Sequence, residues 1–326
     1  MNAQNQPSPQ TEISNGVLRA KVYLPDSQKG YYRGTRFDWS GVIGSLEYQG
    51  HDYYGPWFTK TDSKVNDFIY DGPDIVAGPC SAITGPVEEF SSKNKGLGFD
   101  EAKAGGTFIK IGVGVLRKPD NEDYSPYRLY EIANPGKREV HTKPDSVEFT
   151  QELSDPASGY AYLYTKTVRL VKGKPEMVLA HTLKNTGQHT IETSVYDHNF
   201  LVLDKQPIGP DFVITLPYAM KAEHPLDPQL AKIQGNRLTY LKPLTGRDTV
   251  AATFSGFGQT PASYSIQIEN RKVGAGLRIT GDRPLSEEHL WSIRSVLAME
   301  PYVSMSIEPG KEFTWKYTYS YYTVSH

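Results

Sequence analysis

The sequence contains one cysteine, Cys80, among its 326 residues. A single cysteine excludes an intramolecular disulfide framework and a zinc site built from cysteine ligands. The segment around it, AGPCSAI, holds no cationic side chain that would stabilise a thiolate. We therefore predict an inert, partly buried thiol at Cys80 rather than a catalytic nucleophile.

Neither sign of charge is in excess, and long apolar runs are missing. The chain has 35 Lys and Arg against 37 Asp and Glu, which gives a formal net charge of −2. A protein that binds nucleic acid needs a basic surface, and a membrane-spanning helix needs about 20 apolar residues in a row. The sequence predicts neither a nucleic-acid partner nor a membrane partner, and it leaves the oligomeric state open.

Familiar cofactor and catalytic motifs are also missing. The chain has no GxGxxG, P-loop, HExxH or GxSxG motif, and its histidines show no metal-ligand spacing. Hydride transfer and phosphoryl transfer therefore have no support. We predict that the protein needs no metal and no organic cofactor.

The first ten residues, MNAQNQPSPQ, are polar, contain proline and follow no periodic pattern. Such a segment is typical of the mature end left after removal of a secretory signal, or of a frayed cytoplasmic terminus. We predict a flexible segment over residues 1–14 and a single domain over 15–326. A periplasmic or secreted location is favoured, with a cytoplasmic one as the alternative.

Apolar and polar residues alternate with a period of two along most of the chain, whereas helical periodicity is scarce. Strands are predicted over residues 107–118, 160–171, 176–187 and 311–322, and VKGKP joins the second and third as a hairpin turn. One exception is PLSEEHLWSI, where Ser286 is expected to cap a short helix. The predicted fold class is all-β: one large antiparallel β-sandwich.

The stretch VYDHNFLVLD places polar groups inside an apolar strand. His198 shares one strand face with Tyr196 and Phe200, while Asp197 and Asn199 lie on the opposite face. A buried imidazole is costly unless it is hydrogen-bonded. His198 is therefore either a core histidine satisfied by a neighbouring carbonyl or a functional group.

A second such strand is SVLAMEPYVSMSIEPG, where Glu300 lies on the polar face behind an apolar one. This carboxylate is either solvated or functional. Pro301 follows it and lacks an N–H donor, which predicts a sheet edge, a bulge or the rim of a cleft.

Arginine and aromatic residues gather near the N-terminus, in residues 30–58, and include Arg33, Arg36 and Trp57. Forked N–H donors suit sugar hydroxyls, and a flat ring suits the C–H face of a sugar. The alternative is an Arg–Asp pair among core aromatics, which we favour for Trp39. The adjacent Glu88 and Glu89 are expected to form a solvated pair rather than a site.

On these residues the sequence resembles the galactose mutarotase-like (aldose 1-epimerase) superfamily. The segment DHNFLVL is similar to the family's mid-chain strand with a catalytic histidine, which falls on His198. The segment LAMEPYVSMSIEPGKEFTWKYTY is similar to its late strand with a catalytic glutamate, which falls on Glu300, followed by a PG turn and a last strand. The family's upstream histidine has no match, and Tyr302 replaces a glutamine.

The resemblance implies a large β-sandwich that interconverts sugar anomers by opening the ring. Glu300 would act as the base and His198 as the acid, reaching one sugar from opposite sides. Glu88 or Glu89, if folded nearby, would help to keep His198 protonated. Further candidates for binding a mono- or oligosaccharide are Arg33, Arg36, Trp57, Glu89, Lys110, Lys166, Trp291 and Tyr302. Two alternatives stay open: a uronic-acid lyase or hydrolase on the same fold, and a carbohydrate-binding protein without catalysis.

Overall fold

Two large antiparallel sheets form the body of the protein in the computed structural model, which describes residues 7–324. The larger sheet has ten strands and contains the predicted hairpin and the aromatic C-terminal strand. Its order is β12 (Lys137–Lys143), β13 (Ser146–Asp155), β14 (Tyr160–Leu170), β15 (Glu176–Asn185), β26 (Glu312–Thr323), β23 (Ala275–Gly281), β22 (Ser265–Asn270), β17 (Phe212–Thr215), β20 (Arg237–Tyr240) and β19 (Ala231–Gln234).

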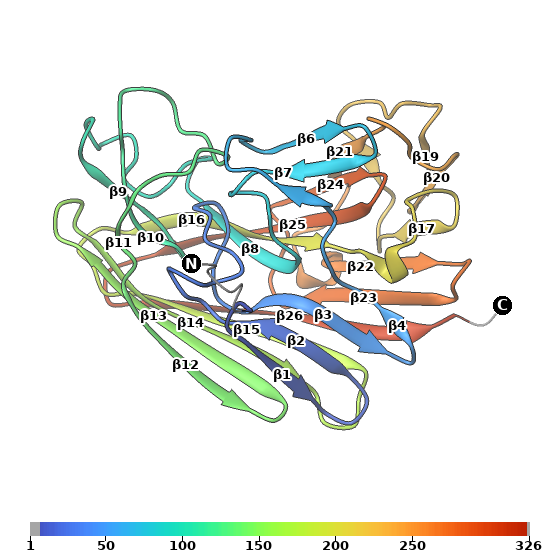
Figure 1. Cartoon of the computed structure of the whole chain (residues 1–326), viewed down its shortest axis with the longest axis horizontal. Helices are drawn as coiled ribbons and strands as arrows, with labels where there is room; N and C mark the ends of the chain where they lie inside the picture. The colour runs from blue at the N-terminus through green and yellow to red at the C-terminus, as the bar shows by residue number, and fades with distance from the viewer. Residues whose placement is uncertain (1–6, 325–326) are drawn as a thin grey trace, which may run out of the picture.

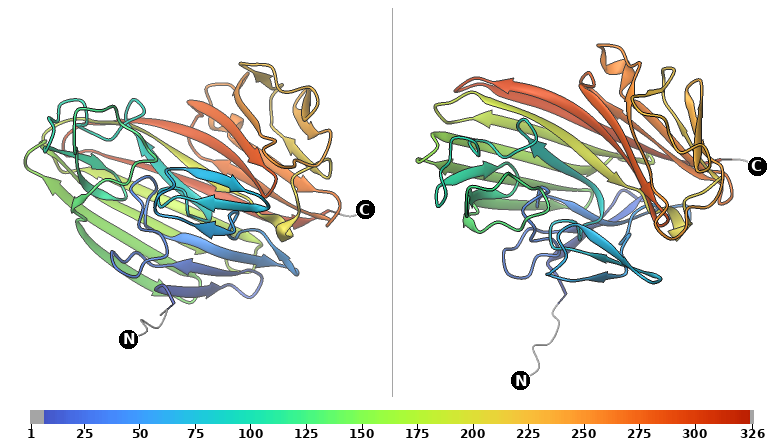
Figure 2. Two further views of the ribbon diagram at one scale, coloured as in Figure 1. Left: turned by 45° about the horizontal axis from the view of Figure 1, so that its top comes forward. Right: turned by 90° about the horizontal axis from the view of Figure 1, so that it is seen from above.

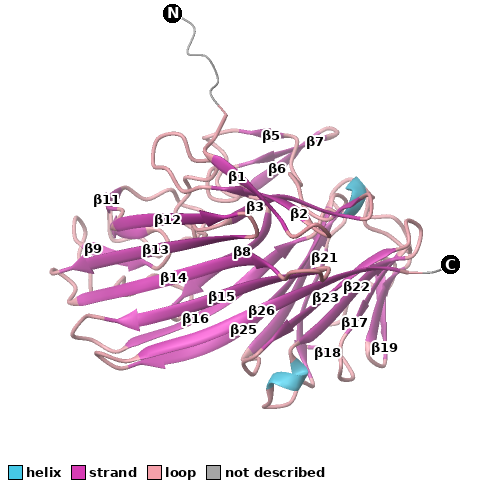
Figure 3. Ribbon diagram, turned by 90° about the horizontal axis from the view of Figure 1, so that it is seen from below, coloured by secondary structure: helices cyan, strands magenta, loops and turns pink. Residues whose placement is uncertain are grey.

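The second sheet has six strands and carries both polar strands found in the sequence. Its order is β18 (Lys221–Ala222), β21 (Val250–Ser255), β24 (Glu287–Ile293), β25 (Val296–Ile307), β16 (Ile191–Phe200) and β8 (Gly85–Ser91). Figure 1 shows β16, β25 and β24 of this sheet above β13, β14, β15 and β26 of the ten-stranded one, and Figure 3 shows the long strands of both from below. The predicted all-β antiparallel sandwich is confirmed.

Three small sheets and two short 3₁₀ helices complete the structure. They are β1 (Gln10–Ser14), β2 (Arg19–Tyr23), β3 (Val42–Tyr48) with β4 (His51–Asp52); β5 (Lys60–Thr61), β7 (Asp74–Ala77) with β6 (Phe68–Asp71); β9 (Thr107–Lys110), β10 (Gly114–Arg117) with β11 (Ile132–Asn134); and the helices Leu203–Lys205 and Pro261–Ser263. None of the helices in residues 7–324 could span a bilayer. Of the segment 1–14 predicted as flexible, residues 10–14 form strand β1, and residues 1–6 lie outside the described part.

Two local predictions are wrong for identifiable reasons. The expected helix at residues 284–293 is strand β24, because pairing with β21 and β25 on either side outweighs the local capping signal. The expected strand over 107–118 is the hairpin of β9 and β10. Gly112 turns it at a φ of +80°, and a Cβ there would meet the Asp38 side chain at 2.7 Å.

The six-stranded sheet is covered on both faces. Side chains such as Val195 and Met299 pack against Leu179 and Tyr319 of the ten-stranded sheet in the main core. The opposite face packs against a second core supplied largely by residues 32–132, including Phe37 and Trp57. Figure 2 shows the N-terminal segments crossing this side of the sheet. The second core leaves a cavity over β16, β25, β24 and β21.

Candidate active site

Strand register places His198 and Glu300 side by side. Strands β16 and β25 pair up to Tyr196↔Tyr302, and the same register returns at the bridge Leu201↔Leu297. His198 therefore lies opposite Glu300, and its Nε2 is 3.3 Å from Glu300 Oε1. Cross-strand neighbours on one sheet face are expected to meet in this way.

The backbone hydrogen-bond ladder between β16 and β25 is interrupted beside His198 and Glu300. Residues 197–200 of β16 do not pair with β25; Asn199 instead donates from Nδ2 to the carbonyl of Met299 at 2.9 Å. Pro301 lies in this stretch, so its missing N–H removes no ladder bond. The predicted sheet edge is wrong, because β25 lies between β24 and β16, but Pro301 does follow a residue that lines the cavity.

The cavity has a volume of about 390 Å³, which is within the range of small-molecule sites. Its floor is the sheet face, and its walls come from the N-terminal segments and the loop after β18. Polar groups are supplied by Arg36, Asp67, Ser81, His198, His224, Thr253, His289 and Glu300, and aromatic rings by Trp57, Phe68, Tyr127, Phe200 and Trp291.

The aromatic wall is buried on one side and partly exposed on the other. Trp57 is buried, stacks on Phe200 with ring centroids 5.8 Å apart, and donates from Nε1 to the carbonyl of Ile83 at 3.1 Å. Trp291 is partly exposed and stands edge-on to Trp57. Both tryptophans predicted to bind a saccharide line the cavity, and Trp291 is the more exposed of the two.

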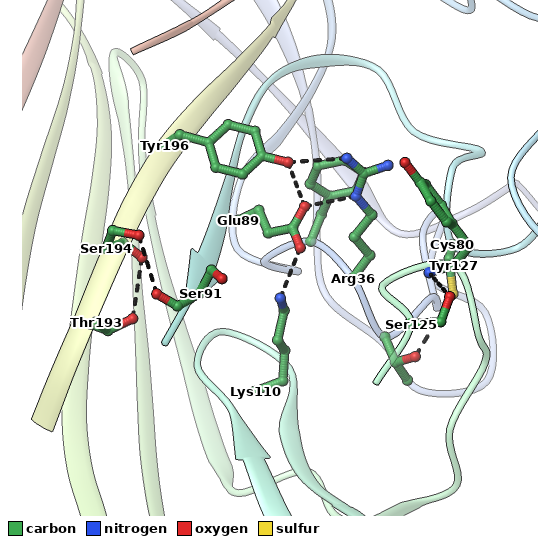
Figure 4. A network of polar contacts seen from close by, with 12 residues as sticks. Arg36, Cys80, Glu89, Ser91, Lys110, Ser125, Tyr127, Thr193, Ser194 and Tyr196 are labelled. Atoms are coloured by element: carbon green, nitrogen blue, oxygen red, sulfur yellow. Dashed lines mark hydrogen bonds and ion pairs between the residues drawn. The ribbon is translucent and has the colours of Figure 1, made fainter. Parts of the chain in front are cut away.

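Arg36 is held in place by a buried network (Figure 4). Its Nε is 2.7 Å from Glu89 Oε2, and its Nη2 donates to the Tyr196 hydroxyl at 3.0 Å. Lys110 Nζ donates to the other oxygen of Glu89 at 2.9 Å. Burial would raise the Glu89 pKa, but Lys110 and Arg36 lower it to about 2. Arg36 therefore faces the cavity, while Glu89 and Lys110 position it from behind.

Several predicted binding residues do not reach the cavity. Arg33 is exposed and donates to the carbonyl of Gln28, so the arginine of the site is Arg36. Lys166 is fully buried in the sandwich, where it pairs with Glu88, and cannot contact a bound sugar. Tyr302 lies beside the cavity, stacked on Tyr196 at 4.4 Å.

The glutamate pair is buried rather than solvated, which corrects that expectation. Glu88 and Glu89 are adjacent in β8 and therefore point to opposite faces of the sheet. Glu89 joins the network behind the cavity, while Glu88 contacts Lys166 and His181 in the main core. Only one of the two can influence the site at short range.

Electrostatics reverse the protonation states expected for the central pair. Burial lowers the pKa of His198 well below its usual 6.5, and Arg36 adds to this effect while Glu89 opposes it. Burial raises the pKa of Glu300 to about 7. Near neutral pH the resting pair is thus a neutral imidazole beside a partly protonated carboxyl, not an imidazolium beside a carboxylate.

The alternative of a satisfied core histidine is not supported. His198 Nδ1 is buried without a hydrogen-bond partner among residues 7–324, and Nε2 contacts Glu300 rather than a carbonyl. Asp197, on the opposite face, accepts a hydrogen bond from the Tyr319 hydroxyl in the main core. The two polar neighbours in this strand thus serve different sides of the sheet.

Three ionisable residues of the cavity, Asp67, His224 and His289, were not singled out from the sequence. Asp67 accepts a hydrogen bond from Ser81 at 2.6 Å, and burial raises its pKa. Asp67 and His224 lie outside regular strands, where no periodic pattern points to them. His289 alternates with Glu287 and Trp291 at a spacing of two, which indicates one face of a strand. Because this segment is predicted as a short helix, the sequence does not place His289 beside Glu300.

Within residues 7–324 no group of three or more His, Cys, Asp or Glu side chains is arranged to hold a metal ion. The cavity instead combines the His198–Glu300 pair, Arg36 and the Asp67 carboxyl with aromatic rings. This combination suits a small polar ligand that has an apolar face.

Comparisons with known proteins identify the fold. No protein-family model and no curated protein matches the chain. Among solved structures, the GalM/aldose epimerase homologue from C. elegans matches with a TM-score of 0.56 at 14% identity, over 98% of this chain and 100% of that one. A galactose mutarotase related enzyme from Lactobacillus acidophilus matches with 0.54 at 15%, over 97% and 98%.

A galactose mutarotase-like protein from Clostridium acetobutylicum has a TM-score of 0.56 at 10% identity, over 96% of this chain and 95% of that one. Identities this low establish the architecture and not the activity. The chain therefore has the galactose mutarotase-like fold, as the resemblance of its sequence predicted.

Proposed function

We propose that the protein is an enzyme that interconverts the α and β anomers of a reducing sugar by acid–base ring opening. The observation that carries this proposal is the contact of His198 and Glu300, from neighbouring strands, on the floor of an aromatic-walled cavity. The fold shared with aldose epimerase homologues is consistent with it, as analogy only.

The 3.3 Å contact suits this reaction better than the predicted placement on opposite sides of a sugar. The two oxygens that exchange protons, the anomeric O1 and the ring oxygen O5, are bonded to the same carbon, C1. An acid and a base that lie close together on one side of the substrate can therefore serve both oxygens. The 3.3 Å between His198 Nε2 and Glu300 Oε1 is a contact distance and is shorter than the width of a sugar ring.

The proton transfers follow from the resting charges. Neutral His198 takes the proton of the O1 hydroxyl while the Glu300 carboxyl gives its proton to O5, and the C1–O5 bond breaks to leave a C1 carbonyl. After rotation about C1–C2, the O5 hydroxyl attacks either face of C1 and returns its proton to Glu300. The His198 imidazolium returns its proton to O1, so the pair ends as it began.

The other cavity groups have supporting roles in this proposal. Trp291 and Phe68 offer ring surface to the C–H face of the sugar, and Arg36 and Asp67 can bind its hydroxyls. Arg36 is already oriented by Glu89 and Tyr196, so little rotamer entropy is lost when a hydroxyl binds.

Polarimetry on freshly dissolved single anomers of common aldoses and uronic acids tests the proposal. We expect at least one sugar to equilibrate at a rate proportional to protein concentration. A uronic-acid lyase would instead release an unsaturated product that absorbs in the ultraviolet. A protein that only binds sugars would leave every rate at its uncatalysed value.

The pH dependence of kcat/KM is expected to be bell-shaped. The active pair carries one proton, and Glu300, with a pKa of about 7, loses it as the pH rises. The rate should therefore fall about tenfold per pH unit on the alkaline side, and fall again in acid as His198 becomes protonated. Stopped-flow polarimetry, corrected for base-catalysed background mutarotation, measures this profile. A rate that climbs through pH 7 to a plateau would contradict the shared proton.

A further inference from the structure

A second histidine borders Glu300 on the side away from His198. Strand β24 pairs with β25 in the register His289↔Glu300, while His198 lies opposite Glu300 on β16. All three side chains line the same cavity. Neighbouring strands are about 4.8 Å apart, so a carboxyl lies in the middle of a row with one imidazole on either side.

The two imidazoles differ in their contacts. His198 touches Glu300 and is 5% exposed. His289 is 29% exposed and forms no ion pair with Glu300; its Nε2 is instead 3.2 Å from Glu287 Oε2, and its ring packs 4.8 Å from Tyr302. Because Glu287 engages Nε2, the nitrogen of His289 left for a ligand is Nδ1. Both His289 and Glu300 line the cavity, so a ligand there can meet both side chains.

The row of His198, Glu300 and His289 matches the positions of the oxygens O5 and O1 in the two anomers. The two anomers share the position of O5, but their O1 atoms lie on opposite sides of C1. A central carboxyl can serve O5 in both anomers. A single imidazole on one flank would have to reach both O1 positions, whereas an imidazole on each flank has one position each.

Resting on that proposed function, we propose a refinement of it: His289, in place of His198, exchanges the proton with O1 of the second anomer. Ring opening of the first anomer passes the O1 proton to His198 and the Glu300 proton to O5. Ring closure to the second anomer returns the O5 proton to Glu300, and the carbonyl oxygen takes a proton from the His289 imidazolium.

One turnover thus moves one proton from His289 to His198, and turnover in the opposite direction moves it back. Exchange with water also restores the starting state. His289 is placed for this exchange because it is partly exposed and contacts Glu287, whose side chain is 59% exposed. No co-reactant other than water is required.

Chemical rescue of the His289→Ala variant tests this role. We expect kcat to fall about 10²-fold with KM nearly unchanged, and added imidazole to restore part of kcat by entering the vacated, partly exposed position. His141→Ala is the matched control, because His141 is an exposed histidine 3.9 Å from Glu139 in β12 of the other sheet. This control should keep wild-type kcat with and without imidazole.

Two results would overturn the inference alone. One is a His289→Ala variant with wild-type kcat; the other is a loss that appears wholly as a raised KM and does not respond to imidazole, which would make His289 a binding residue. In both cases the wild-type protein would be active and Glu300→Gln inactive. A wild-type protein without epimerase activity would instead overturn the proposed function, and the inference with it.

Discussion

Replacing Glu300 by Gln is expected to lower kcat/KM for anomer interconversion by about 10²- to 10⁴-fold, and His198→Asn should have an effect of similar size. Both replacements keep the approximate shape and hydrogen-bonding capacity of the side chain but remove its ability to exchange a proton near neutral pH. Because the two groups share one proton and touch at 3.3 Å, their effects should not add. The double variant should be about as slow as the slower single variant.

Loss of stability would not explain such a result. Burial raises the Glu300 pKa from 4.5 to about 7, so the folded state holds a proton that the unfolded chain releases between these values. The contribution of Glu300 to the free energy of unfolding of the wild-type protein therefore falls as the pH rises from 4.5 to about 7. A glutamine side chain does not ionise, so it carries no cost of burying a charge. In alkaline buffer the Glu300→Gln variant should therefore melt at the same temperature as the wild-type protein or at a higher one.

The matched control for the catalytic pair is the exposed pair on β12. His141→Asn and Glu139→Gln alter a histidine and a glutamate whose nearest charged atoms are 3.9 Å apart, outside the cavity. Their kcat/KM should equal that of the wild-type protein. Wild-type kinetics in Glu300→Gln or His198→Asn would remove these residues from the mechanism.

Replacing Lys166 by Met is expected to lower the free energy of unfolding by about 3–5 kcal/mol, because it leaves buried carboxylates without their cation. Lys166 Nζ bonds Glu88, whose other oxygen is 2.6 Å from His181 Nε2, and all three side chains are fully buried. Burial opposes ionisation of Glu88, but Lys166 and His181 lower its pKa to about 2. The charge of Asp38, buried in the same region, is also stabilised by Lys166.

Urea denaturation measures this effect, and a double variant identifies its cause. Adding Glu88→Gln to Lys166→Met should recover part of the lost stability, because the unpaired carboxylate is removed. Lys137→Met, which breaks an exposed pair with Glu139 at 2.8 Å, should cost at most about 1 kcal/mol. If Lys166→Met kept its stability and raised KM, Lys166 would bind substrate, as the sequence first suggested.

The sequence alone did not predict that Lys166 lies in the main core and not at the cavity. The alternation of β14 and β8 correctly separates two faces for each strand, but it does not say which face meets the cavity and which meets the main core. Lys110 and Lys166 are both buried beside a glutamate, one behind the cavity and one within the sandwich. Only the packing of the two sheets distinguishes them.

His198 and Glu300 could be found because each interrupts a strongly apolar strand, and because their surroundings resemble the family's catalytic strands. The contact between them depends on the register of β16 against β25, which a one-residue shift would abolish. Asp67 and His224 reach the cavity from irregular segments, whose paths depend on tertiary contacts. The pKa of Glu300 likewise comes from burial by residues distant in sequence.

The central claim is that the His198–Glu300 pair opens and closes a sugar ring. Saturation-transfer NMR on an equilibrated aldose measures this directly, because it follows exchange between the α and β signals without a change in concentration. We predict that wild-type protein accelerates exchange for at least one aldose in proportion to its concentration, and that Glu300→Gln at the same concentration does not. Equal exchange with both proteins, or no acceleration of any aldose by the wild-type protein, would contradict the account.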